Sequence, residues 1–134
     1  MSREEVQQAQ QMTAAAGAWL VLDNTYEHFT YEGKPHFCLS APNVVNIFSF
    51  SKAYGMMGWR VGYIAMPDDS QVPGLPAQMV KVQDTIPICP TQVSQTLALE
   101  ALQEGRQWVN EHVAGLQGAL SACWQYHRTR LARR

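Results

Sequence analysis

The sequence is poor in charge: Asp, Glu, Lys and Arg make up 16% of its 134 residues and leave a net charge of −1. A nucleic-acid-binding domain needs a basic face, so we expect no nucleic-acid partner. No apolar run approaches the roughly 20 residues that a membrane-spanning helix needs. The N-terminus also lacks the apolar segment behind a basic start that marks a secretory signal. These absences predict a cytoplasmic protein without membrane contact.

Cysteine is scarce as well, with three residues that are odd in number and far apart. This excludes a disulfide framework and predicts buried or partly buried thiols in a reducing compartment. Neither the cysteines nor the four histidines show the spacing of metal ligands, so we expect no metal site. The residues concerned are Cys38, Cys89, Cys123, His28, His36, His112 and His127.

The apolar residues that are present follow an α/β pattern. Residues 18–22 form an uninterrupted apolar run, which predicts a strand buried on both faces. Helical spacing and end signals predict helices before and after the strands. The expected elements are a helix from the Ser2-x-x-Glu5 capping box to Gly17, strands at 18–22, 44–48 and 59–66, a helix at 77–82, a helix opening at Pro90-Thr91, and a helix after Gly105 that carries Val109, Val113, Leu116, Leu120 and Trp124 on one stripe.

Polar side chains follow two of these strands at the point where each strand ends. Asp23 follows the first strand, and Ser49, Ser51 and Lys52 follow the second. Ligands of open α/β sheets bind beyond the carboxyl ends of the strands, so we expect these groups to share one rim. A strongly hydrated ammonium between apolar runs is a poor choice unless the site uses it.

This set of residue types suits one cofactor chemistry. A lysine amine forms a Schiff base with an aldehyde, including that of pyridoxal phosphate. The ring nitrogen of that cofactor needs a carboxylate to stay protonated, its phenolate oxygen needs a donor, and its phosphate needs hydroxyls and an arginine. The candidates are Asp23, Tyr26, Ser49, Ser51, Lys52 and Arg60.

Two motifs in this region resemble a known family. Ser49-Phe50-Ser51-Lys52, followed by Gly58-Trp59-Arg60-Val61-Gly62-Tyr63, resembles the lysine signature of the fold-type I, class I/II aminotransferases, which depend on pyridoxal phosphate. Asp23-Asn24-Thr25-Tyr26 resembles the upstream Asp-x-x-Tyr of that family. The stretches from Asn24 to Glu27 and from Tyr54 to Trp59 are most similar to plant-type aromatic amino acid aminotransferases.

The resemblance implies an activity and its central residue. It implies amino-group transfer between an amino acid and a 2-oxo acid, with Lys52 as the Schiff-base lysine and as the proton shuttle at the substrate α-carbon. It also implies a fold, part of the three-layer large domain of this family, and a homodimer for the full-length protein.

The resemblance implies roles for the neighbouring residues too. Asp23 would hold the pyridine nitrogen, and Tyr26 would hydrogen-bond the ring hydroxyl. Ser49 and Arg60 would bind the phosphate. Ser51 is a weaker candidate for the same role, because the residue type before the lysine varies in the family.

Each of these residues also has a purely structural interpretation. Asp23 could cap a helix or form an Asx-turn. Tyr26 could be a packing residue. Arg60 could pair with Asp68 or Asp69 at the surface. The lysine, taken alone, could be an ordinary loop residue.

The family also has parts that find no match here, including further strands, a phosphate-binding turn, a ring-stacking aromatic residue and the arginine that binds the substrate carboxylate. The four arginines between 128 and 134 have no family-like context. We therefore expect residues 1–113 to be the central, incomplete part of the large domain. Residues 114–134 would be a helix continuation and basic tail that begin a missing C-terminal region. Such a fragment would be inactive alone, and the alternative is a non-catalytic remnant that binds a subunit or regulates it.

Overall fold

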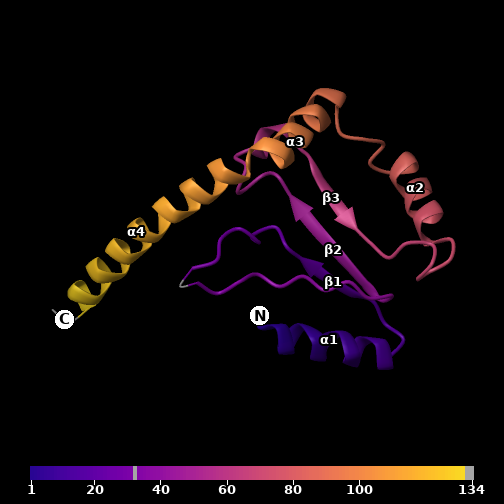
Figure 1. The fold of residues 1–134 in the computed structure, drawn as a ribbon, viewed down its shortest axis with the longest axis horizontal. Coiled ribbons are helices and arrows are strands. Elements are labelled where there is room, and N and C mark those ends of the chain that lie inside the picture. The colour runs from indigo at the N-terminus through magenta and orange to yellow at the C-terminus, as the bar shows by residue number, and fades with distance from the viewer. Residues whose placement is uncertain (32, 132–134) are drawn as a thin grey trace.

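The computed structural model describes residues 1–31 and 33–131, and its elements follow each other in α/β order (Figure 1). They are α1 (Arg3–Ala15), β1 (Leu20–Asp23), β2 (Val44–Ser49), the short 3-10 helix η1 (Met57–Trp59), β3 (Gly62–Ala65), α2 (Leu75–Thr85), α3 (Gln92–Glu104) and α4 (Arg106–Leu131). This order confirms the predicted α/β class, with three strands flanked by helices. No helix in these described ranges combines the length and the apolar character that crossing a membrane requires.

The three strands form one sheet in the order β1-β2-β3. β1 and β2 are parallel, with Asp23 opposite Ile47, and β2 and β3 are antiparallel, with Ser49 opposite Gly62. Both directions agree with the prediction. Because β1 and β2 point the same way, the residues that follow Asp23 and Ser49 emerge at the same edge of the sheet.

The N-terminal helix has the predicted start and covers one face of the sheet. The Ser2 hydroxyl accepts from the Glu5 N–H, and the Glu5 carboxylate accepts from the Ser2 N–H, which completes the capping box. Val6 of α1 packs with Leu22 and Val44 in a buried cluster. This cluster holds β1 and β2 in place behind the rim.

A second buried cluster supports the chain that leaves β2. Phe50, Met56, Val61 and Ala98 pack together and are all less than one tenth exposed. Ala98 belongs to α3, so this helix anchors the segment between β2 and β3. The segment that carries the predicted lysine is therefore fixed at both ends by apolar side chains.

Two predictions about the strands are wrong. β1 is buried on one face only: Leu22 is 5% exposed, whereas Val21 is 55% exposed, because α1 covers only the side of Leu22. The third strand begins at Gly62 rather than at residue 59. The chain forms a 3-10 turn first, and Arg60 then takes a left-handed conformation (φ 52°) that interrupts the extended backbone.

The C-terminal helix carries the predicted apolar stripe, but only its beginning is packed. Val109 is fully buried, while Leu116, Leu120 and Trp124 are exposed. Figure 1 shows α4 extending away from the sheet, which leaves these side chains without a covering element in the described ranges. The predicted basic tail starts within α4, and residues 132–134 lie outside the described residues. The division at residue 113 stays a prediction.

Gly62 of β3 lies close against the backbone of β2. A Cβ atom at Gly62 would lie 2.6 Å from the Phe48 carbonyl oxygen, which is backbone and cannot rotate away. We expect Gly62→Ala to push β3 from β2 beside Ser49 and to lower the free energy of unfolding by roughly 1–3 kcal/mol, the usual cost of overpacking. Urea unfolding followed by circular dichroism measures this.

The matched control is Gly58→Ala. A Cβ atom at Gly58 meets no atom within 4 Å. Its free energy of unfolding should stay within about 0.5 kcal/mol of the wild-type value. Equal midpoints for both variants would show that the close contact at Gly62 does not constrain the sheet.

Candidate functional site

Lys52 is exposed in a tight turn directly after β2. Its neighbours Phe50 and Ala53 are 3% and 8% exposed, so the apolar anchors point inward while the lysine points outward. The Gly55 N–H donates to the Lys52 carbonyl at 3.0 Å, and the Met56 N–H donates to the Phe50 carbonyl at 3.1 Å. Gly55 has a φ of 63°, which a glycine adopts without steric cost. Buried apolar side chains therefore fix this turn, while the Lys52 side chain stays exposed.

Asp23 ends β1 at the same edge, and its carboxylate is ionised. The Asp23 Oδ1 accepts from both the hydroxyl and the N–H of Thr25, and these two bonds hold the pKa of the Asp23 carboxyl below its usual range. The N–H bond is the Asx-turn considered as the structural alternative, and it is present. No bond among the described residues reaches Oδ2, so this oxygen is available to a ligand.

Tyr26 lies beside the lysine. The Lys52 Nζ is 5.8 Å from the centre of the Tyr26 ring, within the range of a cation–π contact. Tyr26 is 61% exposed, which argues against the interpretation as a packing residue. The structure therefore brings the ends of two segments, 26 residues apart in sequence, to one place at the rim.

The two serines are linked to each other. The Ser51 N–H donates to the Ser49 Oγ at 3.1 Å, and Ser49 is the last residue of β2. Hydroxyl groups and backbone N–H groups at a strand end are suitable donors for an anion. Ser49 is also fixed by its pairing with Gly62 on β3.

Arg60 lies in the turn before β3, and its Nη1 donates to the Met57 carbonyl at 2.9 Å. No ion pair joins Arg60 to Asp68 or Asp69 in the described part of the chain, and the Asp68 carboxylate accepts from Ser70 instead. The surface-pair alternative is therefore wrong. However, no hydrogen bond among these residues joins Arg60 to the serines or the lysine either.

Arg60 lines a cavity that Lys52 does not line. It lines a cavity of about 570 Å³ together with Thr91 and Ser94, the first turn of α3. Its left-handed backbone costs an arginine about 1–2 kcal/mol, and such strain is concentrated at functional sites. The strain is maintained by the packing of the neighbouring Val61.

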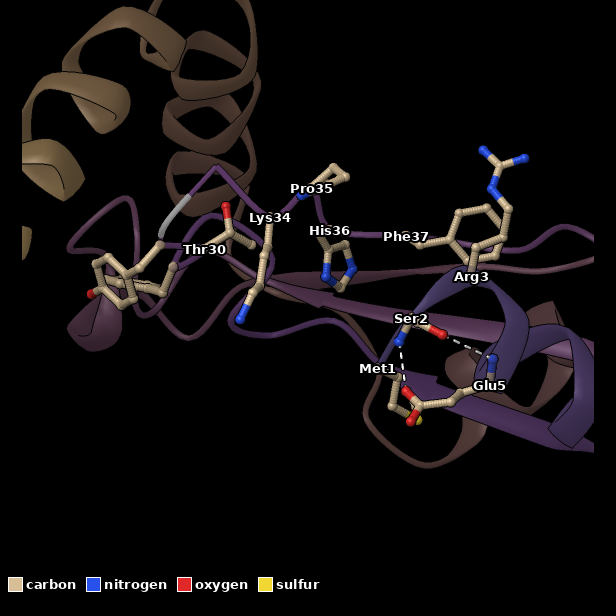
Figure 2. A pocket seen from close by; sticks show the side chains of 11 residues that line it. Met1, Ser2, Arg3, Glu5, Thr30, Lys34, Pro35, His36 and Phe37 are labelled. Atoms are coloured by element: carbon tan, nitrogen blue, oxygen red, sulfur yellow. Dashed lines mark hydrogen bonds between the residues drawn. The ribbon is translucent and has the colours of Figure 1, made fainter.

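A pocket of about 730 Å³ lies between the start of α1 and the residues around Phe37 (Figure 2). None of the predicted site residues lines it. Its helix start is already occupied by the Ser2–Glu5 capping bonds drawn in Figure 2, and the Arg3 guanidinium lies over the Phe37 ring at 4.6 Å. The predicted cofactor site therefore lies outside this pocket.

Sequence reasoning missed the polar network beneath the rim. Asn24 is 4% exposed, and its Nδ2 donates to the Leu22 carbonyl and to Asn46 Oδ1. Asn46 donates in turn to the Leu39 carbonyl. Asn46, a polar residue inside the apolar run 44–48, could have indicated a buried hydrogen-bond network. The predicted buried thiols are also wrong, because all three cysteines are exposed.

The hydrogen bond from the Thr25 hydroxyl to Asp23 allows a prediction about the pKa of the Asp23 carboxyl. We expect Thr25→Val to raise the pKa of Asp23, because the hydroxyl is the largest cause of its low value. A lowered pKa in the folded state gives stability that is present at neutral pH and lost as the pH falls through that pKa, so the variant should lose less stability in acid. Carbon-detected NMR of the Asp23 carboxyl measures the pKa.

Thr30→Val serves as the control, since Thr30 is an exposed loop residue without a bond to Asp23. Its Asp23 titration curve should overlay the wild-type curve. An unchanged curve in Thr25→Val would mean that the hydroxyl does not hold the carboxylate.

The donor set at this rim fits pyridoxal phosphate. Asp23 supplies an ionised carboxylate for a ring N–H, and Tyr26 supplies a hydroxyl. Lys52 supplies an exposed amine beside the Tyr26 ring. The serines supply hydroxyl and N–H groups. The phosphate side is less complete than the ring side, because Arg60 is directed elsewhere.

Comparisons with known proteins agree with this arrangement. The chain is 51% identical over 106 residues to the aromatic aminotransferase ISS1 of Arabidopsis thaliana, a match that covers 79% of this chain and 26% of that protein. It is 31% identical over 94 residues to an aspartate aminotransferase of Pyrococcus abyssi, covering 66% of this chain and 23% of that protein. A crystal structure of an aromatic aminotransferase from Pyrococcus horikoshii OT3 matches 93% of this chain and 34% of its own, with a TM-score of 0.78 and 26% identity.

This chain spans about a quarter of the length of the curated relatives it matches. The family model described as aminotransferase class I and II matches residues 1–125. That range contains the three strands, the lysine turn and the carboxylate at the end of β1. The chain therefore belongs to the class I and II aminotransferase family.

Proposed function

We propose that this chain takes part in pyridoxal-phosphate-dependent transfer of an amino group between an amino acid and a 2-oxo acid. The observation that carries the proposal is the position of the Lys52 amine, 5.8 Å from the Tyr26 ring at the edge where β1 ends in the ionised Asp23. The 51% identity to an aromatic aminotransferase supports an aromatic amino acid as the amino donor.

The residues at the end of β1 would hold the cofactor ring. Asp23 Oδ2 would accept from the ring N–H, and its negative charge would keep that nitrogen protonated. The Tyr26 hydroxyl would donate to the ring oxygen. When bound, the protonated ring supplies an electron sink for charge that develops at the substrate α-carbon.

The residues after β2 would hold the phosphate and move the proton. The Ser49 and Ser51 hydroxyls would bind phosphate oxygens, and the Arg60 guanidinium would bind them in a bidentate manner after leaving the Met57 carbonyl. The Lys52 amine would hold the cofactor at its aldehyde carbon, and the same amine would take and return a proton at the substrate α-carbon. An exposed amine on a fixed turn suits this task, because it can reach the proton without moving the backbone.

We further propose that the site is shared with protein parts that are not matched in this chain. The groups that would grip the substrate carboxylate have no counterpart among its arginines. Exposed apolar residues on α4 and β1, such as Trp124 and Val21, support contact with further protein surface, including a second subunit. Three exposed free cysteines support a reducing, cytoplasmic location.

Absorption spectra of the purified chain with added pyridoxal phosphate test the proposal. We expect a visible band that wild type and the Lys34→Ala variant share and that Lys52→Ala lacks. The same spectrum for wild type and Lys52→Ala would support the alternative, a remnant that binds a subunit without holding the cofactor.

A further inference from the structure

The connection between β1 and β2, residues 24–43, is unusually long for a segment without helix or strand in the described residues. Figure 1 shows it running out from the sheet and back again. Glu27, His36 and Cys38 lie within this connection, and each offers one ligand atom, with the three atoms within 4.8 Å of one another. We propose that these three side chains bind one Zn²⁺, with water as the fourth ligand, and that the metal ties the two arms of the connection together.

The ligand types select the metal. A thiolate and an imidazole are soft and borderline ligands that suit Zn²⁺, whereas Ca²⁺ and Mg²⁺ prefer oxygen ligands alone. Metal–ligand bonds of about 2.0–2.3 Å place ligand atoms roughly 3.5 Å apart around a tetrahedral ion. The three atoms, all within 4.8 Å of one another, therefore need to approach by about 1 Å, which rotation of the half-buried Glu27 and the exposed Cys38 side chains provides.

The imidazole is already oriented by a buried partner. His36 Nε2 lies 2.8 Å from Asn24 Oδ1, and Asn24 directs its own N–H groups to the Leu22 carbonyl and Asn46 Oδ1. The Asn24 oxygen is thus the acceptor, and His36 Nε2 carries the hydrogen. In the neutral imidazole the lone pair is then on Nδ1, which is the nitrogen left for a metal. Ligating histidines ordinarily have such a second hydrogen bond.

The carboxylate and the thiol lie close enough to influence each other. Zn²⁺ binds the thiolate form of cysteine, so metal binding would release the Cys38 thiol proton to water. The His28 Nε2 lies 3.5 Å from the Glu27 Oε1.

The site has a structural consequence for its neighbours. Glu27 adjoins Tyr26, and a metal that holds Glu27 to the arm carrying His36 and Cys38 would restrict the freedom of that whole connection. Cross-links between distant points of a loop stabilise the fold by reducing loop entropy in the unfolded chain. The proposal itself rests on the three ligands and Asn24, and it does not depend on the cofactor.

Titration of the purified 134-residue chain tests the proposal, with Zn²⁺ followed by calorimetry and Co²⁺ followed by absorption. We expect one ion per chain and, for Co²⁺, the intense near-ultraviolet band of a metal–thiolate bond. Cys38→Ser should remove the band, and both Cys38→Ser and His36→Gln should weaken binding by at least about tenfold. Both side chains are exposed, so the variants should fold, and far-ultraviolet circular dichroism checks this.

The matched controls are Cys89→Ser and His112→Gln, which change exposed residues of the same types outside the connection. They should bind both metals as the wild type does. A thiolate band that persists in Cys38→Ser, a band lost in Cys89→Ser, or no saturable Zn²⁺ binding by the folded wild type would overturn the proposal.

Discussion

Borohydride reduction of the chain with pyridoxal phosphate should fix the cofactor on Lys52, and peptide mapping should find almost no label on Lys34 or Lys81. All three lysines carry a primary amine, and that of Lys52 lies beside the Tyr26 ring at the edge where Asp23 holds a negative charge. Cofactor held by these groups keeps its aldehyde near one amine, and this raises the effective concentration there. Label spread evenly over the three lysines would contradict a specific site.

Two substitutions make this prediction sharper. Lys52→Ala should abolish the specific adduct, since it removes the amine. Lys52→Arg should abolish it as well, although the charge stays, because a guanidinium remains protonated and cannot act as a nucleophile. Lys34→Ala and Lys81→Ala are the matched controls and should keep the Lys52 label at the wild-type level. A charge-only role for Lys52 would instead predict retained cofactor binding in Lys52→Arg and loss in Lys52→Ala.

The second large effect concerns turnover. We expect the 134 residues alone to transfer amino groups far below the ordinary enzyme range of ~1–1000 per second. Lys52 would be present, but the substrate α-proton must also be held facing it, and such positioning contributes about 7–11 kcal/mol to lowering a barrier. No arginine of this chain matches the family's carboxylate-binding residue, and Arg60 is occupied with the Met57 carbonyl.

A coupled assay with several amino acids, aromatic ones included, and several 2-oxo acids measures this turnover. The Lys52→Ala variant, run in parallel, defines the background. Turnover in the ordinary range that disappears in Lys52→Ala would mean that the 134 residues suffice and that the proposal of a shared site is wrong. Cofactor trapping on Lys52 without turnover is the combination that the account predicts.

The sequence predicted the features that depend on local pattern. Residue types and spacing were enough to predict the Ser2–Glu5 capping box, the β1 and β2 strands and the cap of α3 at Thr91. The shared position of Asp23 and the lysine turn follows from one further rule, that parallel strands end at the same edge. These elements needed no knowledge of distant contacts.

The features that the sequence could not give depend on what packs against what. An apolar run such as residues 18–22 reads as buried on both faces, but burial needs a covering layer, and α1 supplies one on a single face. The left-handed residue Arg60 lies between Met56 and Val61, which both pack in the second cluster, a contact that no local pattern shows. The Asn24–His36 hydrogen bond joins residues 12 apart in a segment without helical or strand periodicity, so no sequence pattern predicts it.

The most direct test of the central claim is a crystal structure of the chain after borohydride reduction with pyridoxal phosphate. The account predicts continuous density from Lys52 Nζ to the cofactor, with Asp23 Oδ2 within hydrogen-bond distance of the ring nitrogen and the Tyr26 hydroxyl at the ring oxygen. Cofactor attached at another lysine, or a ring nitrogen without the Asp23 carboxylate beside it, would contradict the claim that these residues form one site.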